Sequence, residues 1–343
     1  MSVVFRVDSS NEIGGGHLTR CINIANQLKK KNINSFFILR DLQGADVNSI
    51  EYYDHRYKLI KNSIDYIDDA KQTIEIIKEE SIKADSIIVD NYEIDNKWEN
   101  LLKTKTKKLI VIDDLANKNH NCHILVNQVY DSKPNLYDGL INNSCQLFLG
   151  SKYIFLRPEF NILRKKSNKI CDFSKITDIH IFFSSNDKQG LTIKYSVLLL
   201  KNFPELKLHI SVGNYFVHLK ELKDLALKYK NISWIQNNLN IEEQMAKCQI
   251  AIGTPGMTTW ERACLGIPSI QLGTKDFQDN VLRKLSSNGI CKWLGNEKYI
   301  SEEFFIKTCK EFFRNKQRLK EMREICLKAI DGKGLERVIN LIL

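Results

Sequence analysis

Short apolar runs alternate with longer amphipathic stretches along most of the chain, and this rhythm restricts the possible folds more than any other feature. Strands separated by helices form parallel sheets, because a parallel crossover needs a connection of a dozen or more residues. We therefore expect parallel sheets covered by helices on both faces. In the first half, the apolar runs predict helices over 17–31 and 68–81 and strands at 3–9, 35–40, 86–91, 108–114, 123–128 and 145–150.

The rhythm breaks once and then restarts. Residues 161–176 are basic and polar and predict a linker between an N-terminal domain at 1–160 and a second domain at 177–343 that ends in helices. Two doubly wound domains favour a ligand site at the carboxyl ends of the strands, in a cleft between the domains. In the second domain, we expect helices over 192–203, 216–230, 241–248 and from Thr258, with strands at 178–185, 206–213, 232–236, 250–253 and 269–273.

The composition excludes several classes of protein. Hydrophobic residues make up 43% of the 343 residues and charged residues 27%, which is typical of a folded globular chain. The formal net charge is +10. However, the lysines are spread along helical segments and are not interleaved with aromatic residues, so nucleic-acid binding is not expected. A basic surface also favours a small anionic substrate.

The N-terminus and the cysteines indicate a compartment. The segment MSVVFRVDSS lacks the basic and apolar regions of a secretory signal, and no apolar run approaches the roughly 20 residues of a membrane helix. The nine cysteines form no C-x-x-C pair, as is usual for core residues in a reducing environment. We expect a cytoplasmic protein with no disulfides and no membrane contact. The spacing of His120, Cys122 and His123 matches no zinc motif, so no metal or other cofactor is expected.

Three consecutive glycines follow the first predicted strand and lead into the first helix. Gly14, Gly15 and Gly16 allow the backbone to turn sharply, and the free N–H groups of the helix start suit a phosphate or carboxylate. His17 follows directly. The helix dipole disfavours an imidazolium at this end, so His17 is a candidate general base. The alternative is a histidine that only caps or packs the helix start. The loop matches neither the G-x-G-x-x-G nor the P-loop pattern.

The stretch IAIGTPGMTTWERACLGIP predicts a second anion-binding turn. Gly256 lies in the turn, Thr258 or Thr259 would cap the following helix, and their amide and hydroxyl groups suit a diphosphate. Glu261 can accept two hydrogen bonds from a ribose diol, or it can simply complement the helix dipole. Further polar residues follow the last predicted strand and would either contact sugar hydroxyls or cap the next helix: Asp276, Gln278 and Asn280.

Several segments carry a resemblance to a known family. Residues 7–20, V-D-S-S-N-E-I-G-G-G-H-L-T-R, resemble the start of the PseG family, and similar segments follow in order at 89–95, 111–116, 120–128 and 149–160. Members of that family hydrolyse UDP-2,4-diacetamido-2,4,6-trideoxy-β-L-altropyranose in pseudaminic acid biosynthesis. Residues 253–268 also resemble the nucleotide-binding loop of MurG-like glycosyltransferases.

The resemblance implies a fold, a reaction and a set of site residues. The fold is GT-B, in which two Rossmann-like doubly wound domains face a cleft and the C-terminal domain holds UDP. The reaction is metal-independent, inverting hydrolysis of the UDP-linked sugar by a monomer. His17 matches the catalytic histidine, Glu261 the ribose-binding glutamate and Tyr92 an aromatic position near the sugar. Asp8 and Asn127 lie in similar segments and are expected to bind substrate.

One segment departs from the family pattern. After the first strand of the second domain, family members often have Gly-Gly-x-Asp, whereas this chain has Ser184, Ser185, Asn186 and Asp187. Serine side chains thus stand where the backbone would approach the ligand. A related sugar nucleotide is therefore an alternative substrate. The alternative functions are a MurG-like glycosyltransferase that uses a UDP-amino sugar, and a sugar-nucleotide binding protein without turnover.

Overall fold

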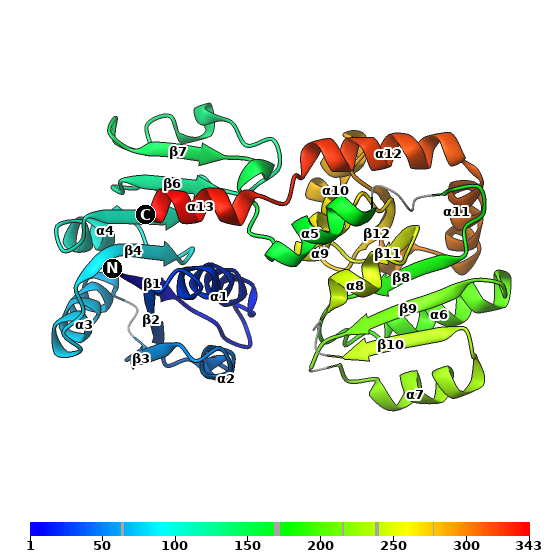
Figure 1. Ribbon diagram of the computed structural model, residues 1–343, viewed down its shortest axis with the longest axis horizontal. Coiled ribbons are helices and arrows are strands. Elements are labelled where there is room, and N and C mark those ends of the chain that lie inside the picture. Colours follow the sequence, from blue (N-terminus) through cyan, green and yellow to red (C-terminus); the bar gives the residue numbers. More distant parts are fainter. Residues whose placement is uncertain (63–64, 168–171, 215, 237–239, 277) are drawn as a thin grey trace. The chain divides into compact units, whose positions relative to one another are not determined.

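The chain folds into two compact α/β units, shown in a computed structural model (Figure 1). Unit 1 comprises Met1–Arg157 and Lys333–Leu343, and unit 2 comprises Pro158–Gly332. The structure describes residues 1–62, 65–167, 172–214, 216–236, 240–276 and 278–343. Within these residues, no helix combines the length and the apolar character that crossing a membrane requires.

Unit 1 is built on a seven-stranded parallel sheet with the order β3-β2-β1-β4-β5-β6-β7. The chain winds outward from β1 on one side and from β4 on the other, so the switch point lies between these two strands. The strands are β1 (Ser2–Val7), β2 (Asn34–Arg40), β3 (Arg56–Ile60), β4 (Ala84–Asp90), β5 (Lys108–Ile112), β6 (Ile124–Asn127) and β7 (Gln146–Leu149). The helices are α1 (Gly16–Lys29), α2 (Val47–Tyr52), α3 (Tyr66–Glu79), α4 (Asn96–Lys103), α13 (Gly334–Ile342) and the 3₁₀ turns η1 (Pro134–Tyr137) and η2 (Ser151–Tyr153).

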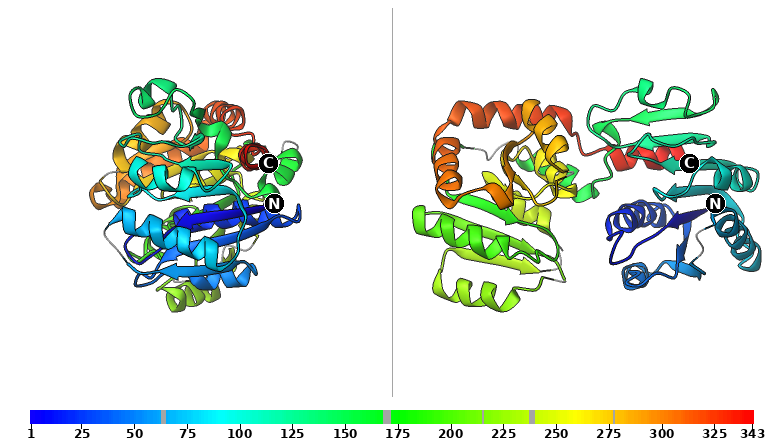
Figure 2. Two further views of the ribbon diagram at one scale, coloured as in Figure 1. Left: turned by 90° about the vertical axis from the view of Figure 1, so that its left-hand side faces the viewer. Right: turned by 180° about the vertical axis from the view of Figure 1, so that it is seen from behind.

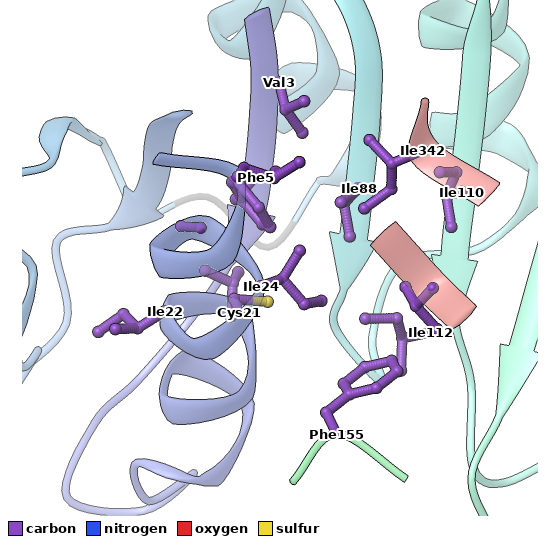
Figure 3. Packing of buried hydrophobic residues seen from close by; sticks show 14 of the residues in the cluster. Val3, Phe5, Cys21, Ile22, Ile24, Ile88, Ile110, Ile112, Phe155 and Ile342 are labelled. Atoms are coloured by element: carbon purple, nitrogen blue, oxygen red, sulfur yellow. The ribbon is translucent and has the colours of Figure 1, made fainter. Parts of the chain in front are cut away.

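The alternation of side chains along β1 explains why both faces of this sheet carry helices. Val3 and Phe5 pack on one face with residues of α1 and α13, whereas Val4 packs on the other face with residues of α3 and α4. In Figure 3, Phe5 and Ile88 from the sheet, Cys21 and Ile24 from α1, and Ile342 from α13 surround one buried region. The sheet thus has apolar side chains on both faces, as its near-continuous apolar runs predict.

Unit 2 repeats the design with a six-stranded parallel sheet in the order β10-β9-β8-β11-β12-β13. Its switch point lies between β8 and β11. The strands are β8 (Asp178–Phe182), β9 (Lys207–Val212), β10 (Ile232–Gln236), β11 (Ile250–Gly253), β12 (Ser269–Gly273) and β13 (Lys292–Asn296). The helices are α5 (Pro158–Ser167), α6 (Leu191–Asn202), α7 (Leu219–Lys228), α8 (Ile241–Met245), α9 (Met257–Leu265), α10 (Gln278–Ser287), α11 (Glu302–Arg314), α12 (Lys316–Ala329) and the 3₁₀ turn η3 (Glu297–Tyr299).

The C-terminal helix α13 belongs to unit 1, which differs from the expected second domain at 177–343. It contacts α1, and the right-hand view of Figure 2 shows it beside α1 and the sheet of unit 1. Its residues Leu335, Val338, Ile339 and Ile342 are buried in the same core as β1. Gly334 allows the close approach, since a Cβ there would lie 2.2 Å from the carbonyl oxygen of Ile154. The apolar face of α13 is visible in the sequence, but the sheet that it covers is not.

The linker expected at 161–176 also differs from the structure. Its first part continues α5, which begins at Pro158 and packs against α9 within unit 2. Arg164 of α5 donates hydrogen bonds to the carbonyl oxygens of Cys264 and Ile330, at 2.9 Å each. Arg164 therefore connects α5 to other segments of unit 2 and is not a solvated linker residue. Residues 168–171 lie outside the described residues.

Two strands, β3 and β13, are not predicted from the sequence because they lack a clear apolar pattern. β3 is an edge strand in which Arg56, Lys58 and Leu59 are exposed, and β13 is an edge strand that contains Gly295. Edge strands are buried on fewer sides, and glycine weakens the strand signal further. The strands that the sequence predicts are all present within a few residues of their expected bounds.

Candidate functional site

The loop between β1 and α1 positions His17 at the switch point of unit 1. Ser10 holds the turn, because its Oγ accepts hydrogen bonds from the N–H groups of Glu12 and Ile13 at 3.2 and 3.0 Å. Gly14 adopts a φ of +81°, which favours glycine. A Cβ at Gly14, Gly15 or Gly16 would meet no atom within 4 Å, so the space beside the turn is open. α1 begins at Gly16 without a side-chain cap.

His17 is hydrogen-bonded to Asp90, which the sequence analysis did not identify as a site residue. His17 Nδ1 lies 2.6 Å from Asp90 Oδ1, and the two side chains come from opposite sides of the switch point, α1 after β1 and the end of β4. Burial raises the pKa of the Asp90 carboxyl, but Arg20 and then His17 lower it by more, so the pKa lies below its usual range. Asp90 is therefore an ionised acceptor. Nδ1 donates to it, and Nε2 of the neutral imidazole keeps its lone pair.

Arg20, one turn later in α1, holds Asp90 in place. Its Nε and Nη2 donate to the two oxygens of Asp90, and its Nη1 donates to Asp114 Oδ2 at 2.6 Å. Arg20 is 7% exposed, and although burial lowers its pKa, Asp90 and Asp114 raise it to well above the usual value. Two carboxylates and one guanidinium leave one negative charge beside His17.

Tyr92 completes the group around His17. Its hydroxyl donates to Asp114 Oδ2 at 3.1 Å, and its ring meets the His17 ring edge-on, with centroids 4.4 Å apart. Burial and then Asp114 raise the pKa of the Tyr92 phenol, which stays protonated at neutral pH. Tyr92 is 36% exposed and His17 is partly exposed, whereas Asp90 is fully buried. We call His17, Arg20, Asp90, Tyr92 and Asp114 the His17 cluster.

Asp8 and Asn127, both expected to bind substrate, are buried. Asp8 is 2% exposed, and its carboxylate accepts hydrogen bonds from Arg6 Nη1 at 2.7 Å, the Arg40 N–H at 2.8 Å and Asn91 Nδ2 at 2.6 Å. Asn127 is 1% exposed and donates to the Tyr137 hydroxyl at 2.8 Å. These positions suit residues that hold the loops after β1 and β6 rather than residues that contact a ligand.

A second cluster, formed by Asp113, His120 and Glu99, holds the turn that carries Asp114. Asp113 accepts the N–H groups of Leu115 and Ala116 at 3.0 and 2.9 Å, which fixes the turn that carries Asp114. His120 Nδ1 lies 2.6 Å from Glu99 Oε1, and His120 Nε2 lies 3.7 Å from Asp113 Oδ2. Burial lowers the pKa of His120, but hydrogen bonds to Asp113 and Glu99 raise it by more, to about 9.

Cys122 and His123, which lie close to His120 in the sequence, have separate partners. Cys122 Sγ lies 3.5 Å from Cys145 Sγ, and His123 Nδ1 accepts the Leu109 N–H at 2.9 Å. Within the described residues, no group of three or more histidine, cysteine or acidic side chains is arranged to hold a metal ion.

In unit 2, the loop after β11 leads into α9. The N-cap of α9 is Gly256, with a φ of +136° and no side-chain cap, so the prediction that Thr258 or Thr259 caps this helix is wrong. Both threonines lie within the helix and are buried, and Thr259 Oγ1 instead donates to Gln271 at 2.9 Å. The absence of a side-chain cap leaves the first N–H groups of α9 available to an anion. A Cβ at Gly256 would meet no atom within 4 Å.

Glu261 and Gln278 occupy different settings. Glu261 is partly buried in the second turn of α9. Burial lowers the pKa of its neighbour Arg262, and the Glu261 carboxylate partly opposes that shift. Gln278 begins α10, and its side-chain oxygen accepts the N–H groups of Thr274 and Lys275 at 2.9 and 3.2 Å. That oxygen therefore already closes the loop after β12.

The loop after β8 carries the departure from the glycine pattern. Ser184 adopts a φ of +117°, a left-handed conformation that favours glycine. Its Oγ accepts the Asp187 N–H at 3.0 Å, and the Asp187 carboxylate accepts the N–H groups of Leu191 and Thr192 at 3.0 and 2.7 Å. The backbone thus keeps a glycine-like path with a serine in it. This strained residue lies at the switch point of unit 2, where ligands of such folds bind.

Solved structures support the fold. Acinetobacter baumannii MurG has a TM-score of 0.69 at 13% identity, with 99% of this chain and 98% of MurG covered. A Neisseria meningitidis UDP-GlcNAc 2-epimerase bound to UDP-GlcNAc has a TM-score of 0.63 at 15% identity, with 99% of each chain covered. Together with the two parallel-sheet units, these likenesses confirm the GT-B fold expected from the sequence.

A search of protein-family models finds no match, but three curated relatives do match. An uncharacterised protein of Methanocaldococcus jannaschii is 29% identical over 83% of this chain, and the chain spans 59% of that relative's length. The Bacillus subtilis spore coat polysaccharide biosynthesis protein SpsG is 20% identical over 100% of this chain and 98% of its own.

The third relative is a UDP-2,4-diacetamido-2,4,6-trideoxy-beta-L-altropyranose hydrolase of Campylobacter jejuni. It is 30% identical over 246 residues, which are 71% of this chain and 81% of the relative. Identity at this level over most of both sequences reflects common descent. The chain belongs to the family of GT-B proteins that contains this hydrolase and SpsG.

Proposed function

We propose that the protein is an enzyme of UDP-sugar metabolism that hydrolyses UDP-2,4-diacetamido-2,4,6-trideoxy-β-L-altropyranose to UDP and the free sugar. The observation that carries this proposal is the His17–Asp90 hydrogen bond at the switch point of unit 1. It combines a partly exposed imidazole with a buried carboxylate that orients it, which is the arrangement of a general base. The name of the Campylobacter relative supplies the substrate, and the reaction would be a step of pseudaminic acid biosynthesis.

In the proposed reaction, His17 Nε2 removes a proton from a water molecule. The water oxygen attacks the anomeric carbon, the bond from that carbon to the UDP oxygen breaks, and the configuration inverts. UDP leaves with the bonding electron pair, and the proton on Nε2 passes to solvent. The Asp90 carboxylate, ionised because Arg20 and His17 outweigh its burial, stabilises the imidazolium that forms.

The proposal assigns the nucleotide to unit 2. The uncapped N–H groups at the start of α9 suit a diphosphate, and their partial positive charge stabilises the departing UDP without a metal. Glu261 would bind the ribose, and Gly256 would let the backbone approach the phosphates. In unit 1, Gly14, Gly15, Gly16 and Tyr92 would contact the sugar, with Asp8 and Asn127 as positioning residues.

The test is to incubate the purified protein with this UDP-sugar and EDTA, without an acceptor, and to follow UDP by NMR. We expect steady UDP release that falls by about 10²–10⁴-fold in His17→Asn, as is typical for the loss of a general base. A smaller fall in this variant would assign His17 to structure. Turnover that stops with EDTA and returns with a divalent cation would contradict the metal-independent reaction.

A second candidate is a glycosyltransferase, which the likeness to MurG favours. The two functions differ in their need for an acceptor, because a transferase releases little UDP until an acceptor is present. A third candidate, a sugar-nucleotide binding protein, would bind UDP tightly without forming product. The Ser184–Asp187 loop supports a related sugar nucleotide as the substrate alternative, so a panel of UDP-amino sugars belongs to the same experiment. The cytoplasmic location and the monomeric state stay predictions.

A further inference from the structure

The second turn of α9 contains a fully buried arginine. Arg262 is 0% exposed, although arginine is almost never buried without a charged partner. Its Nη2 donates to the carbonyl oxygen of Phe182 at 3.1 Å, and its Nη1 makes a long contact of 3.4 Å with the carbonyl oxygen of Thr254. Its Nε has no hydrogen-bond partner. The guanidinium is thus poorly satisfied by the protein itself.

The charge of Arg262 is also poorly compensated. Among the described residues, no carboxylate forms a hydrogen bond or ion pair with the guanidinium. Burial lowers the pKa of Arg262 to about 10, and the nearby Glu261 and Cys291 only partly oppose that effect. Arg262 therefore remains a cation at neutral pH, in a setting that disfavours a cation.

The surroundings of Arg262 place this charge at the switch point of unit 2. Phe182 ends β8, and Thr254 follows β11, so the guanidinium joins the carboxyl ends of the two strands that flank the switch point. The neighbouring glycine is needed for this arrangement. A Cβ at Gly253 would lie 1.8 Å from the carbonyl oxygen of Phe182 and 2.6 Å from Arg262 Nη2.

A buried, uncompensated cation lowers stability, and apolar residues of similar volume in such positions are often neutral or stabilising. An anion near the uncapped start of α9 would supply the missing negative charge. We infer that Arg262 is an electrostatic positioning residue that holds the phosphate groups of the nucleotide through its buried charge. This inference rests on the proposed function, because it takes the nucleotide to bind at α9. The guanidinium contacts the carbonyl oxygen of Thr254, in the turn before α9, so its charge can act on the ligand without direct contact.

The rival explanation is purely structural, with Arg262 only tying the ends of β8 and β11 together. The two explanations differ in how an Arg262→Met variant responds to ligands of different charge. Loss of a buried charge weakens binding in proportion to ligand charge, whereas collapse of the loop weakens all ligands alike. Uridine, UMP and UDP form a suitable series, since they share the nucleoside and differ in the number of phosphates.

The experiment measures the dissociation constants of the three ligands by calorimetry or ligand competition for wild type, Arg262→Met, Arg262→Lys and Arg283→Met. Arg283 is an exposed arginine on α10 that stacks on Trp293, so its variant removes one positive charge from the surface of the same unit. We expect Arg262→Met to raise the dissociation constant of UDP by about 30–100-fold and that of UMP by about 5–10-fold, and to leave that of uridine unchanged. Arg283→Met should leave all three dissociation constants within about twofold of the wild-type values, because solvent screens exposed charges.

Arg262→Lys keeps the charge and loses the forked hydrogen bonds, and it covers the case in which the methionine variant does not fold. We expect it to retain the ratio of UDP to UMP affinity of the wild type. An equal loss for all three ligands in Arg262→Met, or a lost ratio in Arg262→Lys, would overturn the inference and leave Arg262 a structural tie. Failure of the wild type to bind UDP would instead overturn the proposed nucleotide site itself.

Discussion

At the scale of single residues, Asp90 determines what His17 can do. Its carboxylate accepts from His17 Nδ1 and also from the Arg20 guanidinium, so the imidazole has one preferred orientation and one preferred tautomer. Asn in this position preserves the shape but can present its NH₂ group to Nδ1. That contact favours the tautomer with the proton on Nε2, which cannot accept a proton from water.

We therefore predict that Asp90→Asn lowers kcat by about 10²–10⁴-fold with little change in KM. Asp54→Asn is the matched control, because Asp54 is an exposed partner of Lys29 far from the His17 cluster in sequence. Steady-state kinetics on both variants measures the effect. A change confined to KM would mean that Asp90 serves binding instead of proton transfer.

His120 makes a prediction about stability and pH. Burial lowers its pKa, but Asp113 and Glu99 raise it to about 9 in the folded protein, against about 6.5 for an unperturbed histidine. A folded pKa above the unfolded one adds stability that is fully present below about pH 6.5 and is lost as the pH rises through about 9. Urea unfolding at pH 7 and pH 10 should therefore show a larger loss of stability for wild type than for His120→Gln. Equal losses in the two proteins would refute this coupling.

At the scale of secondary-structure elements, the switch points organise both units. In unit 1, the ends of β1 and β4 bring His17 and Asp90 together. In unit 2, the ends of β8 and β11 are joined by Arg262. In each case the loop that leaves the first strand contains a residue with positive φ, Gly14 in unit 1 and Ser184 in unit 2. The proposed site residues of both units thus lie at the same part of the same topology.

The return of α13 to unit 1 gives a prediction at this scale. Ile342 is 0% exposed and packs in the core that contains Phe5 and Ile88, so Ile342→Ala should lower the free energy of unfolding of unit 1 by about 2–5 kcal/mol. Leu343 is 49% exposed, so Leu343→Ala should change it by less than about 0.5 kcal/mol. Hydrogen exchange in urea, read by mass spectrometry, reports the two units separately. Lost protection in α11 and α12 rather than in unit 1 would place α13 with unit 2.

At the scale of the whole molecule, the sequence predicts local secondary structure but not the contacts between residues that are far apart in the sequence. The apolar runs indicate both parallel sheets, and the glycine loop indicates the start of α1, because strand burial and helix starts depend on neighbouring residues. Asp90 pairs with His17 across 73 residues of sequence, and no local pattern marks that partner. The same is true of Asp114, which meets Arg20 across 94 residues.

The domain boundary was difficult to predict for the same reason. The sequence of α13 predicts an amphipathic helix, but only the tertiary structure places it on the sheet of unit 1. The cap of α9 illustrates a different difficulty. Thr258 and Thr259 are residues of a type that often caps helices, yet Gly256 takes the N-cap position with a positive φ that only glycine adopts easily.

The proposed function requires water activated by His17 to attack the anomeric carbon of a UDP-linked sugar. The most direct measurement is to run the reaction in ¹⁸O-labelled water and to locate the label by mass spectrometry, with NMR of the first sugar anomer formed. We predict that ¹⁸O enters the sugar at its anomeric carbon, that the configuration is inverted and that the UDP contains no label. Label in the β-phosphate of UDP, or a sugar released with retained configuration, would contradict the claim.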